Sequence, residues 1–116
     1  EFIRRRARMA YEPIIGSGKN ACVLHYIEND CECQDGDLLL VDVGASYANY
    51  CADLTRTYPV NGRFTQRQRD VYEAVRRVLD SSIARSVVGT SIREWKREAQ
   101  IEMTKELVGL GLITPE

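Results

Sequence analysis

The chain has 116 residues, of which 44% are hydrophobic, 28% charged and 8% aromatic. This composition excludes a disordered tail, and the length predicts one globular domain with one core. The formal net charge of −1 provides no overall attraction to nucleic acid or to an acidic membrane. We therefore expect neither nucleic acid nor a membrane as a partner.

The termini and the cysteines bear on location and completeness. No apolar run reaches the length of a membrane span, about 18 residues, and residues 1–6 lack the apolar core of a secretory signal. Four cysteines are few for a secreted domain held by disulfides, so we expect a cytoplasmic protein. The chain opens without Met and closes on Gly109–Glu116, where a new element would begin, so we expect both ends to be cut from a longer protein.

The first third of the chain predicts short elements joined by turns. Residues 1 to about 9 predict the last turns of a helix, with an arginine cluster that we interpret as a solvated helix end. Residues 14–15 and 21–26 predict strands, separated by a turn at Gly16–Asn20. The polar residues 29–37 predict a surface loop.

The most apolar run, residues 38–44, predicts a fully buried strand, with residues 48–58 as its antiparallel partner. One residue inside this run, Asp42, is charged. Burying an ionised carboxylate without a partner costs many kcal/mol, so Asp42 must be paired, hydrogen-bonded or bound to a cation.

A second carboxylate, Asp53, follows eleven residues later in the partner strand. With a two-residue turn at Ser46–Tyr47, Asp42 lies opposite Cys51 and Asp53 lies diagonally on the same face. Two adjacent negative groups repel unless a cation lies between them, so the pattern predicts a divalent metal site. Oxygen ligands suit manganese or magnesium, and also cobalt and zinc. The structural alternative is that Asp42 caps a turn while Asp53 pairs with Arg56 on the surface.

The second half of the chain predicts two amphipathic helices. Thr65 with Gln68 forms a capping box, and the apolar residues that follow share one face until Gly89. Ser91 repeats the capping pattern for a second helix, which ends near Gly109. The apolar faces comprise Val71, Tyr72, Val75, Val78, Leu79 and Ile83 in the first helix and Ile92, Trp95, Ala99, Met103 and Leu107 in the second.

His25 is the only histidine, and in a predicted strand it is either a hydrogen-bonded core residue or a functional group. Its neighbours suggest a different kind of site, a structural zinc site that implies no enzyme, because four zinc-type ligands occur within twelve residues. These ligands are Cys22, His25, Cys31 and Cys33. Their spacing differs from that of a standard zinc finger or ribbon, which weakens this alternative.

Three ordered segments together resemble one family. They are EPIIGSGKNACVLHY at residues 12–26, DGDLLLVDVG at residues 35–44 and YCADLTRTYPVNGRFT at residues 50–65. Over essentially the whole chain the sequence resembles Xaa-Pro aminopeptidase, also called aminopeptidase P, of the pita-bread metallopeptidases. Prolidase, the Xaa-Pro dipeptidase, is the second match.

The resemblance implies an α/β fold of the α+β type, in which residues 1–116 form the N-terminal half of a pita-bread (creatinase/aminopeptidase) catalytic domain. This half has a curved antiparallel sheet with two packed helices. The implied cofactors are two divalent metal ions, Mn²⁺ in this family. By the family pattern Asp42 binds one ion, Asp53 bridges both, and His25 approaches the substrate and stabilises the tetrahedral intermediate. Thr55 shares a strand face with Asp53 by alternation, so we expect it to support the ligands.

The implied activity is removal of an N-terminal residue that precedes proline, by attack of a metal-bridging hydroxide. The pattern also requires a further histidine and two glutamates, which lie beyond Glu116 in the family, so we expect the chain alone to be an inactive fragment. The alternatives are an Xaa-Pro dipeptidase and a non-catalytic pita-bread binding module. The expected partners are peptides with proline in second position. We also expect homo-oligomers, including dimers favoured by apolar surface that truncation exposes.

Overall fold

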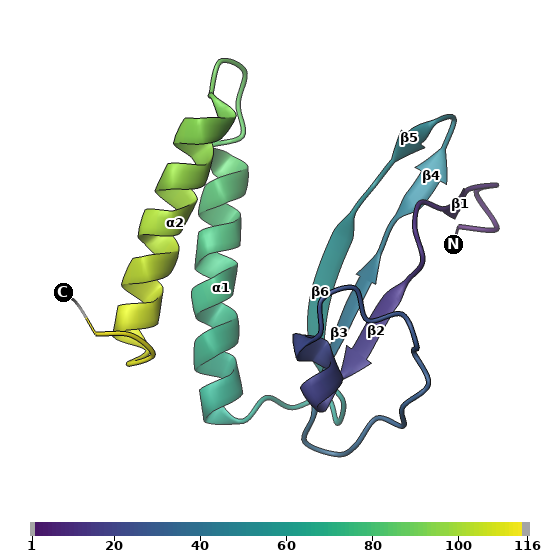
Figure 1. The fold of residues 1–116 in the computed structure, drawn as a ribbon, viewed down its shortest axis with the longest axis horizontal. Helices are drawn as coiled ribbons and strands as arrows, with labels where there is room; N and C mark the ends of the chain where they lie inside the picture. Colours follow the sequence, from purple (N-terminus) through teal and green to yellow (C-terminus); the bar gives the residue numbers. More distant parts are fainter. Residues whose placement is uncertain (1, 115–116) are drawn as a thin grey trace. The chain divides into compact units, whose positions relative to one another are not determined.

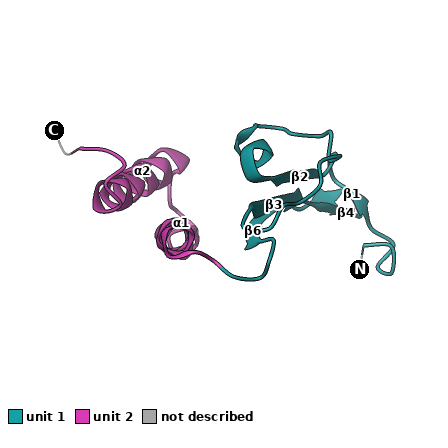
Figure 2. Cartoon of the chain, turned by 90° about the horizontal axis from the view of Figure 1, so that it is seen from below, with its two compact units in different colours: residues 1–63 teal, residues 64–116 magenta. Residues whose placement is uncertain are grey.

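The computed structural model describes residues 2–114, which fall into two compact units, one up to Arg63 and the other from Phe64 (Figure 2). Short antiparallel strands make up the first unit and two helices make up the second, so the α+β class is confirmed (Figure 1). That residues 1–116 form one partial domain stays a prediction. None of the helices among the described residues is long and apolar enough to cross a membrane.

The first unit is built around β3 (Leu38–Val43), the central strand of a three-stranded antiparallel sheet. Strand β2 (Ile14–Ser17) pairs with one side of β3, and β6 (Leu54–Pro59) pairs with the other. Every residue of β3 is half-buried rather than fully buried, which corrects the expectation from its apolar sequence. The physical reason is that, among the described residues of this unit, the only helix is one short 3-10 segment, too small to cover the sheet.

Strand β3 continues through Gly44 into β4 (Ala45–Tyr47), and the chain returns as β5 (Tyr50–Cys51) and then β6. The turn is Ala48–Asn49, with φ of 48° and 68°, as in a type I′ hairpin turn. The predicted turn at Ser46–Tyr47 is therefore wrong by two residues, and Asp42 lies opposite Thr55 instead of Cys51. Because the shift is even, the side chains that share a face stay the same.

The N-terminal segment is not the end of a helix, at least over residues 2–9, which the structure describes. Turns at residues 2–6, with Arg6 at a φ of 57°, lead into β1 (Arg8–Met9), which pairs with β4. The backbone of this segment finds its partners in the neighbouring sheet, for example Ala10 N–H to Gly44 O at 2.8 Å, which local sequence pattern does not reveal.

The predicted strand at residues 21–26 is also wrong. A 3-10 helix, η1 (Gly18–Cys22), occupies its beginning, and His25 lies in a turn with a φ of 55°. Gly18, at a φ of 56°, ends β2 and turns the chain back over it. A Cβ on Gly16 would lie 2.8 Å from the carbonyl oxygen of Asn20, so only glycine allows η1 to pack this closely. The predicted loop at residues 29–37 is present and exposed.

The second unit is a helical hairpin of α1 (Gln66–Ala84) and α2 (Ile92–Gly109). The Thr65–Gln68 capping box is confirmed, since the Gln68 side chain accepts from the Thr65 N–H at 2.9 Å and the Thr65 hydroxyl accepts from the Gln68 N–H at 3.3 Å. Helix α1 ends at Ala84, before the predicted Gly89, because the chain turns over residues 85–90.

Polar contacts join the two helices at several levels. Trp95 Nε1 donates to the Ser82 carbonyl at 2.8 Å, and Arg77 binds Glu106 through two hydrogen bonds of 2.8 and 2.6 Å. Arg85 pairs with Glu102 and lowers the pKa of that carboxyl to about 2. The predicted apolar face of α1 is only partly buried. Val78 is buried, whereas Val75, Leu79 and Ile83 are exposed.

Candidate metal centre

The two predicted carboxylates lie close together. Asp42 is the fifth residue of β3, and Asp53 directly precedes β6. The backbone of Asp42 pairs with that of Thr55, so Asp53, two residues before Thr55, is its diagonal neighbour on the same face of the hairpin. Asp42 is half-buried and Asp53 is exposed, so the pair lies where the sheet meets solvent.

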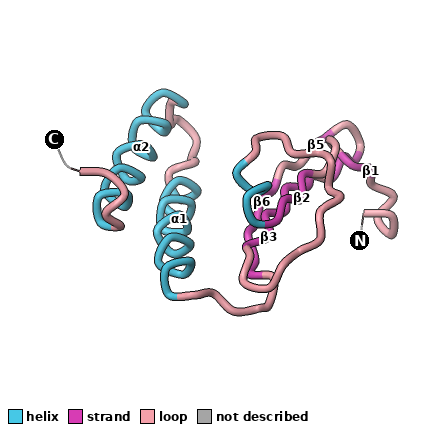
Figure 3. The backbone as a smooth tube through the Cα atoms, turned by 60° about the horizontal axis from the view of Figure 1, so that its bottom comes forward, coloured by secondary structure: helices cyan, strands magenta, loops and turns pink. Residues whose placement is uncertain are grey.

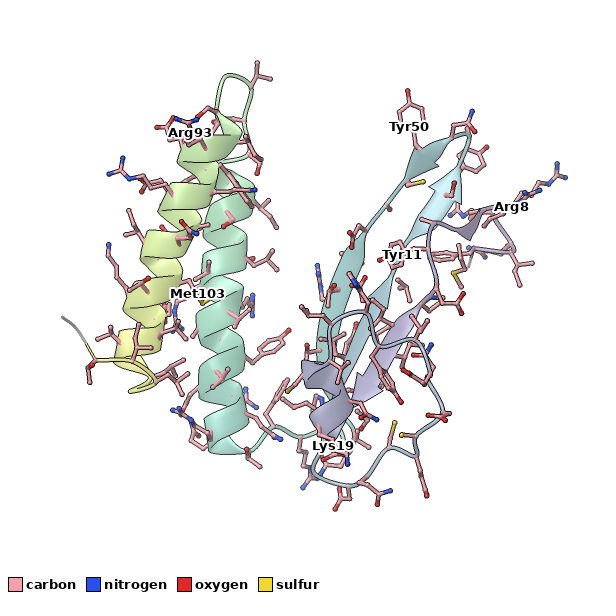
Figure 4. All side chains as sticks on the ribbon, viewed as in Figure 1. Arg8, Tyr11, Lys19, Tyr50, Arg93 and Met103 are labelled. Atoms are coloured by element: carbon pink, nitrogen blue, oxygen red, sulfur yellow. The ribbon has the colours of Figure 1, made fainter. Side chains whose placement is uncertain are left out.

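One side chain connects both carboxylates. The hydroxyl of Tyr11 hydrogen-bonds to Asp42 Oδ1 and lies 3.2 Å from Asp53 Oδ1. Tyr11 belongs to the segment between β1 and β2, and its ring extends from there toward the neighbouring strands (Figure 4). The contact therefore shows that Asp42 and Asp53 face the same point in space.

A bulge in the N-terminal strand places Tyr11. Between the pairs Met9–Ala45 and Ile14–Asp42, this strand has four residues against two in its partner, so two residues are extra. Bulges bend a strand and redirect its side chains. The Tyr11 ring then packs on Gly44, where a Cβ would lie 2.7 Å from Tyr11 Cε1 and 1.9 Å from the carbonyl oxygen of Ala52. Glycine is therefore the only residue type that allows the Tyr11 ring and the Ala52 carbonyl to approach position 44 this closely.

Tyr11 acts as a donor at neutral pH. Burial, followed by the hydrogen bond with Asp42, raises the pKa of the Tyr11 phenol to about 12. Its single proton can serve only one carboxylate at a time, so the two negative groups are only partly compensated. The alternative in which Asp53 pairs with Arg56 is not observed. Arg56 Nη1 donates to the Thr55 carbonyl at 2.8 Å, and no ion pair joins Arg56 to Asp53 among the described residues.

This donor set fits a divalent cation in kind but not in number. Carboxylate oxygens on one face are the ligands that hard and borderline divalent ions take. Within residues 2–114, however, no three His, Cys, Asp or Glu side chains gather closely enough to hold an ion. Asp42 and Asp53 therefore supply two carboxylate donors on one face, and their role as metal ligands stays a prediction.

The remaining candidates lie outside this carboxylate pair. Thr55 is exposed, and its backbone lies opposite that of Asp42 in the β3–β6 pair. His25 is exposed in the turn after η1 and not in a strand, which corrects the sequence-based placement. The structure records no hydrogen bond from either side chain to Asp42 or Asp53, so their roles stay predictions.

The alternative zinc site is not formed. Its three cysteines are free and exposed, and no group of three metal-binding side chains was found in the described part of the chain. Cys31 instead hydrogen-bonds with Asp30 and Tyr26. The four side chains lie in η1, in the turn at His25 and in the loop before β3, and no three of them gather in one place.

Tyr11 is the site residue that the sequence reasoning missed. It precedes Glu12-Pro13, and proline within a strand pattern signals an edge or a bulge. That signal predicts an irregularity near Tyr11 but not the direction of its side chain, which depends on Gly44 more than thirty residues away.

The chain matches the model of metallopeptidase family M24 over residues 1–115 and belongs to that family. Among its relatives, the Xaa-Pro aminopeptidase of Escherichia coli K12 is 49% identical over 114 residues, covering 97% of this chain and 26% of the relative. The Xaa-Pro aminopeptidase of Haemophilus influenzae is 46% identical, with the same coverage.

Solved structures of Escherichia coli aminopeptidase P are also similar to this chain. Three structures of Escherichia coli aminopeptidase P, each with one residue replaced by alanine, match with TM-scores of 0.91 to 0.93 and 46 to 47% identity. They cover 99% of this chain and 26% of the matched chain, so the chain spans about a quarter of the length of these relatives. Their replaced residues are a histidine and two aspartates, separated by seventeen and then eleven residues, as are His25, Asp42 and Asp53.

Proposed function

We propose that this chain is part of the catalytic domain of a metal-dependent Xaa-Pro aminopeptidase, which removes an N-terminal residue preceding proline. The observation that carries the proposal is the pair of carboxylates, Asp42 and Asp53, brought to one point by the Tyr11 hydroxyl. The family membership and the shared spacing of the histidine and two aspartates support it. The activity belongs to the parent protein, since these residues supply only part of a metal site.

In this proposal Asp42 and Asp53 would hold two divalent ions, Mn²⁺, with Asp42 binding one ion and Asp53 shared between both. When bound, the ions supply Lewis acidity and an activated water for peptide hydrolysis. Tyr11 orients the carboxylates by donating its proton, and Thr55 supports Asp42 across the β3–β6 pair. His25, exposed on its turn, is available to contact the substrate and to donate to the oxygen that gains charge.

Removing the metal tests the proposal directly. The parent protein, stripped with a chelator, is expected to lose cleavage of a peptide with proline in second position and to regain it when Mn²⁺ is added back, because the carboxylates cannot activate water alone. Release of the N-terminal residue is measured by chromatography, with an alanine-for-proline peptide as the control. Full cleavage by the stripped protein would contradict the proposal. Cleavage of dipeptides alone would identify the prolidase alternative.

Tyr11→Phe is expected to weaken metal binding and lower kcat in the parent protein by about tenfold to a hundredfold, the usual effect of losing a hydrogen bond to a metal ligand. Without the phenol the two carboxylates lose their shared donor. Titration with Mn²⁺ and steady-state kinetics measure both effects. Tyr50→Phe is the matched control, because Tyr50 is 84% exposed at the end of the hairpin. Equal metal affinity in both variants would remove Tyr11 from the site.

We also propose that the isolated chain self-associates and that the parent protein is cytoplasmic, the latter consistent with four free cysteines. Large apolar side chains such as Leu24, Val75 and Val88 are exposed in the two units, and exposed apolar groups favour association. Sedimentation of the 116-residue chain is expected to show dimers or larger species, whose fraction grows with concentration. A monomer at all concentrations would contradict this.

A further inference from the structure

The loop that carries His25 is attached to the sheet although it contains no regular structure. Residues 23–37 connect η1 to β3 without a helix or strand (Figure 3). A histidine that must reach a substrate from such a loop needs its backbone fixed by other means, since unanchored loops are mobile. Two side chains of the same loop, Asn29 and Tyr26, provide such anchors.

Asn29 occupies the free edge of β2. Strand β2 is an outer strand of its sheet, and in an extended chain the Pro13 carbonyl and the Ile15 N–H point to the same edge. Asn29 Oδ1 accepts from Ile15 N at 2.7 Å, and Asn29 Nδ2 donates to the Pro13 carbonyl at 2.9 Å. The carboxamide thus forms the two hydrogen bonds that the backbone N–H and C=O of one residue in a neighbouring strand would form.

The same side chain also holds its own loop. Asn29 Nδ2 lies 3.0 Å from the carbonyl oxygen of Ile27, so one carboxamide joins the loop backbone to the strand edge. Asn29 has a φ of 50°, in the left-handed region, which Asn tolerates better than most residues. Few other residue types could combine this backbone conformation with a donor and an acceptor.

The attachment point lies on the strand that pairs with the strand of Asp42. Pro13 and Ile15 flank Ile14, whose backbone pairs with that of Asp42. Asn29, four residues after His25 in the chain, therefore binds the backbone on either side of the residue that pairs with Asp42.

Tyr26 fixes the other side of the segment. It is 8% exposed, and its hydroxyl accepts from Asn20 Nδ2 at 3.2 Å and lies 3.2 Å from Asp30 Oδ1. Residues 26–29 are thereby held at both ends, and His25 directly precedes the first anchor.

We propose that Asn29 is a positioning residue for His25: by capping the edge of β2 it fixes the loop from which His25 reaches the substrate beside Asp42 and Asp53. This role rests on the proposed peptidase function. Asn29 itself contacts neither substrate nor metal in this role, so it acts on catalysis only through His25.

Kinetics of the parent protein test the role. Asn29→Ala is expected to lower kcat for a peptide with proline in second position by about tenfold to a hundredfold, the range for a misplaced catalytic group. KM and Mn²⁺ affinity are expected to change less than threefold, because the carboxylates are untouched. Asn29→Asp retains the acceptor for Ile15 and loses both donor bonds, so an intermediate loss is expected. The matched control is Gln34→Ala, a carboxamide of the same loop with only a 3.5 Å contact to Glu32.

A double-mutant cycle separates positioning from a general structural effect. In the His25→Ala background, Asn29→Ala is expected to cause no further loss, because the residue through which it acts is gone. Losses that multiply in the double variant would overturn the proposal. So would a fall in Mn²⁺ affinity as large as the fall in kcat.

Hydrogen exchange gives a readout that does not depend on activity. In the parent protein, Asn29→Ala is expected to speed exchange about tenfold at the Ile15 amide and over residues 23–28, since the hydrogen bonds that fix them are lost. Unchanged exchange would overturn the proposal. If the parent protein cleaves no proline peptide but exchange rises as expected, the anchoring by Asn29 stands and the peptidase function fails.

Discussion

Asp42→Asn and Asp53→Asn are each expected to lower kcat/KM of the parent protein by about a thousandfold or more. A lost metal ligand removes several kcal/mol of transition-state stabilisation, and each 1.4 kcal/mol is a factor of ten. Because Asp53 is proposed to be shared by two ions, its variant should bind fewer Mn²⁺ ions per chain than the Asp42 variant. Metal analysis by mass spectrometry and peptide kinetics measure the two effects.

A matched control is Asp80→Asn, which changes the same carboxylate to the same amide on the surface of α1, where Asp80 only pairs with Arg76 at 3.6 Å. It is expected to retain activity within twofold. Wild-type cleavage by either variant of the pair would remove the carboxylates from the mechanism. Loss of activity with full metal content would assign them a role other than ligation.

Gly44→Ala is the substitution expected to have the largest effect on stability. The new Cβ would lie 1.9 Å from the Ala52 carbonyl oxygen and 2.7 Å from the Tyr11 ring, and the first of these atoms is backbone that cannot turn away. The two arms of the hairpin must therefore move apart at Gly44 and Ala52, and the Tyr11 ring must be displaced as well. Overpacking of this kind costs about 1–3 kcal/mol, and the free energy of unfolding should fall by an amount at the upper end of that range.

Thermal or denaturant unfolding of the parent protein measures the effect, and Mn²⁺ titration reports on the displaced Tyr11. Gly109→Ala provides the control, because a Cβ there meets nothing within 4 Å at the end of α2. It is expected to be neutral or slightly stabilising, as alanine favours helix. Equal unfolding of the two variants would show that the close approach at Gly44 relaxes without cost.

Several elements could be predicted from interactions between residues that are close in the sequence. The Thr65 capping box and the Ser91 cap fix where the helices begin, because each is completed within four residues. The apolar run at 38–43 is a strand as expected. The alternation of side chains also predicted Asp42 and Asp53 on one face. This prediction holds although the turn was misplaced, because the register shifted by an even number of residues.

Elements that depend on distant partners were not predictable in this way. The segment 21–26 has the composition of a strand, but the turn at Gly18 and the packing of η1 on Gly16 redirect it. Residues 8–9 become a strand only because β4 offers them hydrogen-bond partners. The early end of α1 at Ala84 likewise reflects the turn that leads into α2 and not a local breaker.

By itself the sequence determined the candidates for the site and the family: two carboxylates set eleven apart in a hairpin, one histidine, and three segments typical of a metallopeptidase. Only the tertiary structure decided that Tyr11 joins those carboxylates and that Asn29 fastens the histidine loop to the edge of β2. The physical reason is the distance along the chain over which each interaction acts. Strand alternation acts between adjacent residues, whereas the direction of Tyr11 and the attachment of Asn29 depend on contacts between segments that only folding brings together.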